Sequence, residues 1–170
     1  VAQMANALGD KESYQVLMER SKNYRNLFDK STGFLRARWE DGSWVTPYDP
    51  GIPYYVYMYR ESNGWMSTFF APQDPEGLIA LYPSKADFEA KLDAVFSTPF
   101  GGYEADNMTG WYGMYCVGNQ PSQGVSYYYY FVGKPEKTQE KIDVIMNDYY
   151  AKDIGNKIRH GYREKQKKGI

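Results

Sequence analysis

Apolar side chains near the start of the chain recur at helical spacing. A glycine follows a run of helix-forming residues at Gly9 and predicts the end of a first short helix. From Asp10, a residue suited to capping a helix, apolar positions then follow the i, i+3, i+4 rule. They are Tyr14, Leu17, Met18, Tyr24 and Phe28. The pattern predicts an amphipathic helix from residue 10 to about residue 28, with a break at Gly33.

The pattern changes to an alternation of apolar and charged residues between Phe34 and Trp39. Asp41-Gly42 follows as a turn signal, so a short extended or hairpin segment is expected within residues 34–44. Prolines at positions 47, 50 and 53 then predict a loop as far as Tyr59. Loops of this size inside compact domains are often functional.

Helical patterning returns after this loop. Asp74-Pro75 and Ser84 carry the residue types that start helices. The predicted helices cover residues 64–71, 74–81, 84–97, 121–132 and 135–152. The predicted fold class is therefore all-α with long loops and at most a short β-hairpin, and helix pairs with elaborated loops suit a barrel or toroid better than a simple bundle. Beyond residue 150 the apolar pattern fades, and residues 151–170 form a charged tail that we expect to be solvated.

Composition excludes several classes of protein. The chain has 170 residues and a net charge of -1, which argues against a nucleic-acid partner recognised through a basic surface. No apolar run approaches the roughly 20 residues that span a bilayer, and no secretory leader is recognisable at Val1. One cysteine, Cys116, and one histidine, His160, leave little material for a disulfide framework, a zinc site or a histidine-dependent triad.

Aromatic residues make up 18% of the chain, and 18 residues are tyrosines. Tyrosine combines a flat apolar face with a hydroxyl, which suits carbohydrate sites but also packed cores and interfaces. In the run Tyr127-Tyr128-Tyr129-Tyr130 the four side chains of a helix would point in four directions, so most of them are expected to pack.

Two loop motifs could carry chemistry. In Arg60-Glu61-Ser62-Asn63-Gly64-Trp65 a carboxylate stands beside aromatic residues, where desolvation can raise the pKa of a general acid. The alternative is that Glu61 pairs with Arg60 or caps the following helix. In Val117-Gly118-Asn119-Gln120-Pro121 two amides precede a helix, and amides both donate to and accept from sugar hydroxyls. The alternative there is a capped helix start with a solvated amide.

Together these motifs resemble the catalytic domain of glycoside hydrolase family 92, the exo-α-mannosidases. Family members carry Glu-Gly-Asn-x-Trp before an aromatic, Pro and Asp stretch, then Gly-Asn-Glu-Pro-Ser-His, then Gly-x-Pro-x-Lys-Thr-Gln. The matching segments here are residues 61–65, 70–74, 118–123 and 133–139, preceded by a fitting stretch at 34–50. Their order and spacing cover about Met4 to Tyr150, so residues 1–150 resemble part of a catalytic domain.

The resemblance implies part of an (α/α)6 barrel, inversion of configuration, and a calcium ion that helps to hold and distort the mannose; no calcium ligand can be assigned. By motif position Glu61 would be the general acid, and Trp65, Asn119 and Gln120 would contact the substrate. The family's base lies in a downstream Gly-Asn-Asp segment, but Lys157 follows Gly155-Asn156 here. The chain alone is therefore expected to lack a base and to be inactive, with Glu104 and Asp106 the nearest other carboxylates to consider.

Gln120 stands where the family usually has Glu, and Gln123 where it often has His. Loss of a carboxylate removes repulsion against an anionic substrate, so a mannosyl-phosphate linkage is one expectation. The alternatives are an inactive carbohydrate-binding paralogue and a structural fragment that packs against other chains. Expected partners are a mannose-containing glycan and either the remainder of the catalytic domain or a second copy, without nucleic acid or membrane. The resemblance also implies a secreted or periplasmic location.

Overall fold

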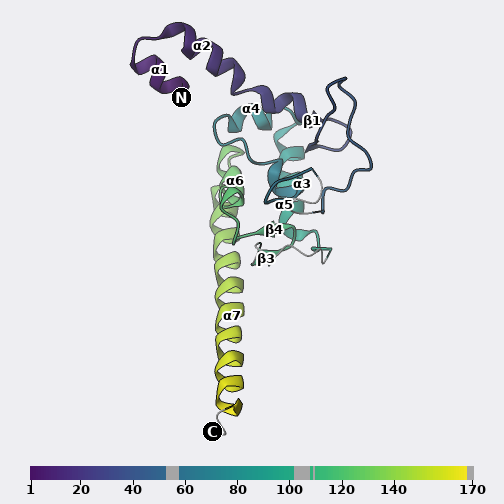
Figure 1. Cartoon of the computed structure of the whole chain (residues 1–170), viewed down its shortest axis with the longest axis vertical. Helices are drawn as coiled ribbons and strands as arrows, with labels where there is room; N and C mark the ends of the chain where they lie inside the picture. Colours follow the sequence, from purple (N-terminus) through teal and green to yellow (C-terminus); the bar gives the residue numbers. More distant parts are fainter. Residues whose placement is uncertain (53–57, 102–107, 109, 168–170) are drawn as a thin grey trace.

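The computed structural model describes residues 1–52, 58–101, 108 and 110–167. Short helices and loops form a body from which one long helix projects (Figure 1). In the parts of the chain just given, strands form only two-stranded antiparallel sheets, one of β1 and β2 and one of β3 and β4. The predominance of helix confirms the expected class. The arrangement of these helices does not test the expected barrel, which stays a prediction.

The N-terminal helices are α1, Ala2–Ala7, and α2, Lys11–Arg20. Asp10 caps α2 as expected, since its side chain accepts a hydrogen bond from the backbone N–H of Ser13. The prediction that this helix continues to Phe28 is wrong. The chain turns after Arg20 into a 3₁₀ helix, η1, Asn23–Leu27. There the Tyr24 hydroxyl donates to Asp74 across 2.9 Å, a tertiary contact that the helical periodicity did not include.

Two short hairpins interrupt the helices. In the first, β1, Phe28–Asp29, pairs with β2, Phe34–Leu35, so residue 34 pairs backward along the chain instead of forward. Within the predicted 34–44 hairpin only a single bridge, Arg38 to Trp44, is present. The second hairpin joins β3, Trp111–Tyr112, to β4, Tyr115–Cys116. The expectation of at most one short hairpin is therefore wrong.

The remaining helices lie close to their predicted positions. They are α3, Gly64–Ser67; α4, Pro75–Ile79; α5, Lys85–Ser97; the 3₁₀ turns η3, Gln120–Ser122, and η4, Val125–Tyr127; α6, Tyr128–Phe131; and α7, Pro135–Lys167. The predicted caps are confirmed. Asp74 accepts from the N–H of Gly77, and Ser84 accepts from the N–H of Asp87 while its hydroxyl donates to the Asp87 carboxylate.

The core is centred on α5. Its fully buried residues Phe88, Leu92 and Val95 form one cluster with aromatic residues of α6 and of the segment after α3. Phe88 meets Phe69 edge to face at 5.4 Å, an arrangement that aromatic pairs favour. Of the tyrosine run, Tyr128 and Tyr129 are buried, while the flanking Tyr127 and Tyr130 are exposed. Half of the run therefore packs, which is less than was expected.

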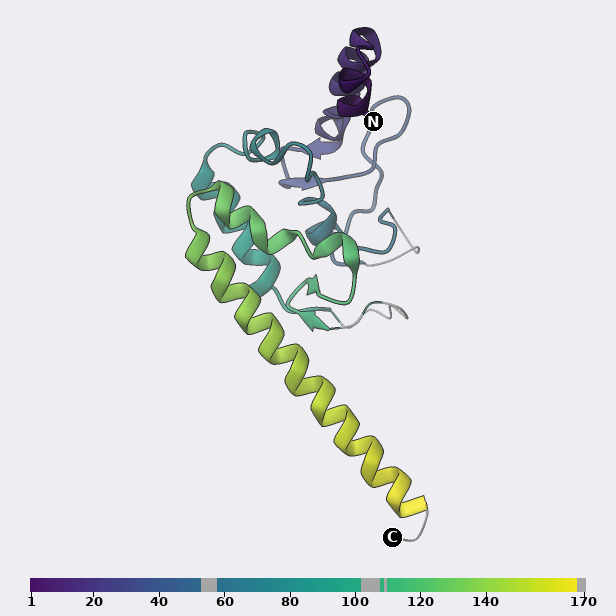
Figure 2. The ribbon, with the colours of Figure 1, turned by 90° about the vertical axis from the view of Figure 1, so that its left-hand side faces the viewer.

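Helix α7 starts beside the core and ends far from it. Near its start Lys137 forms ion pairs with Glu89 at 2.6 Å and Asp93 at 2.8 Å, which attach α7 to α5. The helix continues through the charged segment after residue 150 to Lys167. Figures 1 and 2 show this distal part extending beyond every other element of the ribbon. Among the helices of the described residues, none has the length and apolar character needed to cross a bilayer.

Candidate active site

The two motifs that sequence analysis singled out meet in space. The side-chain amide of Asn119 donates a hydrogen bond from Nδ2 to the backbone carbonyl of Glu61, across a separation of 58 residues in the chain. Asn119 is buried and lies between β4 and η3. Its Nδ2 is therefore directed at the loop that carries Glu61, which makes Asn119 a positioning residue in this structure. Its predicted contact with a sugar stays a prediction.

Glu61 has an unusual backbone conformation. Its φ is +52°, and Glu61 is the only residue other than glycine with a positive φ in the described part of the chain. Such a left-handed conformation costs a residue with a Cβ about 1–2 kcal/mol. Its side chain is partly exposed. A strained, partly exposed carboxylate residue whose carbonyl is held by a second loop is a feature typical of functional sites.

Asn63, two residues further on, is the structural centre of this loop. It is fully buried, its Oδ1 accepts from the N–H of Met66 at 2.9 Å, and its Nδ2 donates to the carbonyl of Met114 at 3.2 Å. One side chain thus caps α3 and ties it to the second hairpin. Gly64 follows because there is no room for more: a Cβ there would lie 2.9 Å from both Pro50 and the Tyr59 hydroxyl.

The second loop, residues 117–123, is anchored close to Asn63 and α3. The backbone N–H of Cys116 donates to the sulfur of Met66, and the Ser122 hydroxyl is within hydrogen-bonding distance of the Cys116 and Asn119 carbonyls. These groups are buried, so the contacts satisfy polar atoms that water cannot reach. The position of Glu61 therefore depends on residues from both loops.

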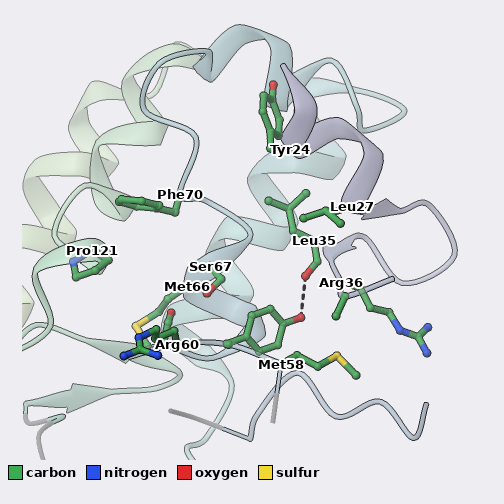
Figure 3. Close-up of a pocket in the computed structure, with 13 residues that line it drawn as sticks. Tyr24, Leu27, Leu35, Arg36, Met58, Arg60, Met66, Ser67, Phe70 and Pro121 are labelled. Carbon is green, nitrogen blue, oxygen red and sulfur yellow. Dashed lines mark hydrogen bonds between the residues drawn. The ribbon is translucent and has the colours of Figure 1, made fainter. Parts of the chain in front are cut away.

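A cavity of about 400 Å³ opens beside this junction (Figure 3). Its walls are mostly apolar, and Arg60 and Ser62, the neighbours of Glu61, contribute polar groups. Figure 3 shows Phe70 and Pro121 on one side and Leu27 and Leu35 on the other. The full lining is Tyr24, Leu27, Leu35, Arg36, Ala37, Met58, Tyr59, Arg60, Ser62, Met66, Ser67, Phe70 and Pro121.

Gln120 borders a second, smaller cavity of about 260 Å³. Phe70 and Pro121 line both cavities, so the two are neighbours. The lining of the second cavity also includes the aromatic residues Tyr127 and Phe131. Gln120 is exposed, so its side chain is accessible to a ligand. An amide next to aromatic surface can bind a sugar ring through hydrogen bonds and apolar contact.

Trp65 is more enclosed than its predicted role suggests. Its ring packs edge to face on Phe34, with centroids 4.8 Å apart, and the ammonium of Lys91 lies 5.0 Å from its centroid. Burial lowers the pKa of Lys91 to about 8. Sequence reasoning missed Lys91, because nothing in the α5 pattern indicates that this residue reaches back to the 32–34 turn, where it donates to the Thr32 carbonyl. The predicted contact of Trp65 with substrate stays a prediction.

An ion pair buried next to the larger cavity supports the first hairpin. Arg36 and Asp29 lie 2.9 Å apart with 10% and 4% of their side chains exposed, and the guanidinium sits 4.4 Å from the centroid of Tyr48. Burial acts to raise the pKa of Asp29, but hydrogen bonds from Ser31 and Arg36 outweigh it, and the pKa is lowered. Figure 3 shows the Arg36 head group turned away from the cavity. Its role is therefore structural.

The calcium ion and the base that the family resemblance implies need ligands and a carboxylate beyond this junction. Within residues 1–52, 58–101, 108 and 110–167, no group of three or more His, Cys, Asp or Glu side chains gathers as a metal site. Calcium takes six to eight oxygen ligands, so these residues do not fit it by themselves. Glu104 and Asp106 lie outside the described residues, and Lys157 stands on the distal part of α7.

The chain is largely helical, and Glu61, whose backbone carbonyl accepts a hydrogen bond from Asn119, lies at the junction of two loops. The sequence profile of the glycosyl hydrolase family 92 catalytic domain matches residues 1–157, and the chain belongs to this family. A relative from the fungus Arthroderma benhamiae, named as an uncharacterized secreted glycosidase, is 25% identical over 73% of this chain and 17% of its own length.

Solved structures agree. The family GH92 α-mannosidase BT3965 from Bacteroides thetaiotaomicron, in complex with mannoimidazole, superposes with a TM-score of 0.78 at 29% identity, covering 86% of this chain and 20% of that one. The inverting GH92 mannosidase BT2199 from the same organism gives a TM-score of 0.68 at 27% identity, covering 86% and 21%. The chain therefore spans about a fifth of the length of the relatives it matches.

Proposed function

We propose that the chain is the part of an inverting exo-α-mannosidase that carries the general acid, Glu61. The observation that carries the proposal is the hydrogen bond from Asn119 to the Glu61 carbonyl, which joins the two family motifs at a strained residue. In an inverting glycosidase one carboxylic acid protonates the leaving oxygen while a second carboxylate activates water. The second carboxylate comes from elsewhere in the enzyme, so the isolated chain is expected to be inactive.

The proposal extends to the setting of the enzyme. The likeness to mannosidases supports a mannose-containing glycan as substrate, and the secreted fungal relative supports a secreted or periplasmic location. Calcium dependence belongs to the whole enzyme in this proposal, because the described residues hold no set of acidic ligands for the ion. Nothing in the assignment of Glu61 depends on the metal.

Replacing the acid tests the assignment. In the full-length enzyme, Glu61→Gln should lower kcat by about 10²- to 10⁴-fold on a substrate with a poor leaving group. The loss should be much smaller on an activated aryl mannoside, whose leaving group hardly needs a proton. Glu76→Gln, at an exposed acidic residue on α4, is the matched control and should leave both rates unchanged. Equal losses on both substrates would give Glu61 a structural role instead.

Gln120 suggests the substrate preference. A Glu at this position would repel a phosphate oxygen, whereas a neutral amide can donate a hydrogen bond to it. The enzyme is therefore proposed to prefer a mannosyl-phosphate linkage over neutral α-1,2-mannobiose. Gln120→Glu should shift the ratio of kcat/KM toward the neutral disaccharide. An unchanged ratio would mean that position 120 does not read charge, and absence of turnover on either substrate would favour a carbohydrate-binding protein without catalysis.

A further inference from the structure

Lys91, on α5, carries a half-buried ammonium group. The ammonium donates a hydrogen bond to the Thr32 carbonyl at 3.0 Å, and it lies 3.3 Å from the ring centroid of Phe34 and 5.0 Å from that of Trp65. Buried charges are usually paired with a counter-charge. Here burial alone accounts for the lowered pKa of Lys91, and a carbonyl with two aromatic rings holds the cation.

The two rings join α3 to the first hairpin. Trp65 belongs to α3 and meets Phe34 of β2 edge to face, with centroids 4.8 Å apart. Beside them the backbone N–H of Leu35 donates to the hydroxyl of Thr68, the residue that ends α3. Lys91 brings α5 into the same contact. Cation–π contacts gain strength when water is excluded from them, so the ammonium should hold α3 at a fixed position on β2.

The position of α3 in turn determines that of the loop before it. Asn63 caps α3 through the N–H of Met66, and Glu61 lies two residues before Asn63. On its other side the loop is held by Asn119, which donates to the Glu61 carbonyl. The loop is therefore attached to α3 at one end and to the second loop at the other, and a shift of α3 would move Glu61 relative to Asn119.

We propose that Lys91 is a positioning residue, whose ammonium holds α3 against the first hairpin and thereby places Glu61 for proton transfer. The inference rests on the proposed role of Glu61 as the acid. The contacts that carry the effect join residues within the chain, so they do not depend on which of its surfaces the rest of the enzyme covers. A displacement of about 1 Å in a catalytic group can lower the rate of its step by about 100-fold.

Kinetics of the full-length enzyme test the proposal. In Lys91→Met, which keeps an unbranched side chain without the charge, kcat on a substrate with a poor leaving group should fall by about 10- to 100-fold with little change in KM. Turnover of an activated aryl mannoside should be almost unchanged, which also shows that the variant is folded. Lys91→Arg keeps the charge and can stack on the rings, so it should restore most of the loss. Lys85→Met, at the exposed start of α5, is the matched control and should equal the wild type on both substrates.

Glu61→Gln in the same assay separates this proposal from the assignment of the acid. If Glu61→Gln loses turnover mainly on the poor leaving group while Lys91→Met loses none, or loses equally on both substrates, the acid stands and Lys91 has no positioning role. Equal losses in Lys91→Arg and Lys91→Met, or in Lys85→Met and Lys91→Met, would also overturn the role of the ammonium. If Glu61→Gln shows no difference between the substrates, the acid assignment fails, and this proposal fails with it.

Fluorine NMR tests the contact without turnover. In the full-length enzyme labelled with fluorotryptophan, the signal of Trp65, assigned with Trp65→Phe, should shift as Lys91 titrates, because burial lowers the pKa of Lys91 to about 8. Tyr82 packs on the same turn, where its hydroxyl donates to the Gly33 carbonyl at 2.8 Å, but burial raises the pKa of Tyr82 and its titration lies at higher pH. Lys91→Met should abolish the shift, and Lys85→Met should retain it. A Trp65 signal that does not change near pH 8, or that changes equally in Lys91→Met, would overturn the contact that the proposal needs.

Discussion

The junction around Glu61 and the distal part of α7 differ in what holds them in place. The junction has no helix longer than the four residues of α3, yet Asn63 and Asn119 tie its two loops together through hydrogen bonds that are buried or partly buried. Helix α7 has 33 residues with regular hydrogen bonds of its own, and its distal part extends away from the core (Figure 1). Regular secondary structure and tertiary stability are therefore unequally distributed in this chain.

The difference has a physical origin. A helix closes its hydrogen bonds within four residues, so α7 can form without a partner, although isolated helices are marginal in water. An irregular loop has no such local pairing, and each buried polar group needs a partner from elsewhere in the chain. Substitutions in the body should therefore be far more costly than substitutions on distal α7, and the following predictions test that expectation.

The largest loss is expected at the buried ion pair. Asp29→Ala leaves the guanidinium of Arg36 buried without its counter-charge, which should lower the free energy of unfolding by about 3–5 kcal/mol. Lys22→Ala, which removes an exposed ion pair with Glu19, should cost less than about 1 kcal/mol. Urea denaturation of the three proteins makes the comparison. Similar losses in the two variants would show that burial of this pair has little energetic effect.

Asn63 gives the next largest effect. Asn63→Ala removes the cap of α3 and leaves the Met114 carbonyl without its donor, at a combined cost of about 2–4 kcal/mol. Asn156→Ala, an exposed asparagine on α7, should change stability by no more than about 0.5 kcal/mol. Both values come from denaturation curves. If Asn156→Ala proved as costly as Asn63→Ala, distal α7 would be held by contacts within the fold.

Acid should weaken the body through two aspartates. Burial acts to raise the pKa of Asp29 and of Asp74, but hydrogen bonds outweigh it, from Ser31 and Arg36 in the first case and from Arg25 and Tyr24 in the second, so both pKa values are lowered. A lowered folded-state pKa contributes stability that is present above the unfolded value of 3.8 and lost as pH falls through the folded-state value. Unfolding free energy measured from neutral pH downward should decline below pH 4, and Asp74→Asn should make that decline shallower. An unchanged pH dependence in Asp74→Asn would show that the Asp74 carboxylate does not contribute to the loss of stability in acid.

The smallest effect is a gain. Glu61→Gly relieves the left-handed backbone at that residue and should raise stability by about 0.5–1 kcal/mol, although the enzyme would lose its proposed acid. Glu76→Gly, in the regular helix α4, should instead lose about 0.5–1 kcal/mol. Thermal melting of both variants shows whether each substitution raises or lowers stability. A loss in Glu61→Gly would mean that contacts of the Glu61 side chain outweigh the backbone strain.

Local features of the fold were readable from the sequence because their causes are local. The caps at Asp10, Asp74 and Ser84 each act on a backbone N–H three residues away, and the structure confirms all three. Family membership could also be predicted from the sequence, because the order and spacing of the motifs can be recognised without knowing the fold. The end of α2 was not, because the chain turns at Arg20 toward a contact with Asp74, more than fifty residues away.

The sequence by itself determined the helical class, the caps, and the motif that makes Glu61 a candidate acid. Only the tertiary structure decided that Asn119 would hold the Glu61 carbonyl and that Lys91 would lie against Trp65. It also decided that the distal part of α7 would extend away from the body of this chain. The physical reason is the range of the interactions: caps and helical periodicity act within one turn, whereas a buried amide finds its acceptor only after distant segments have packed together.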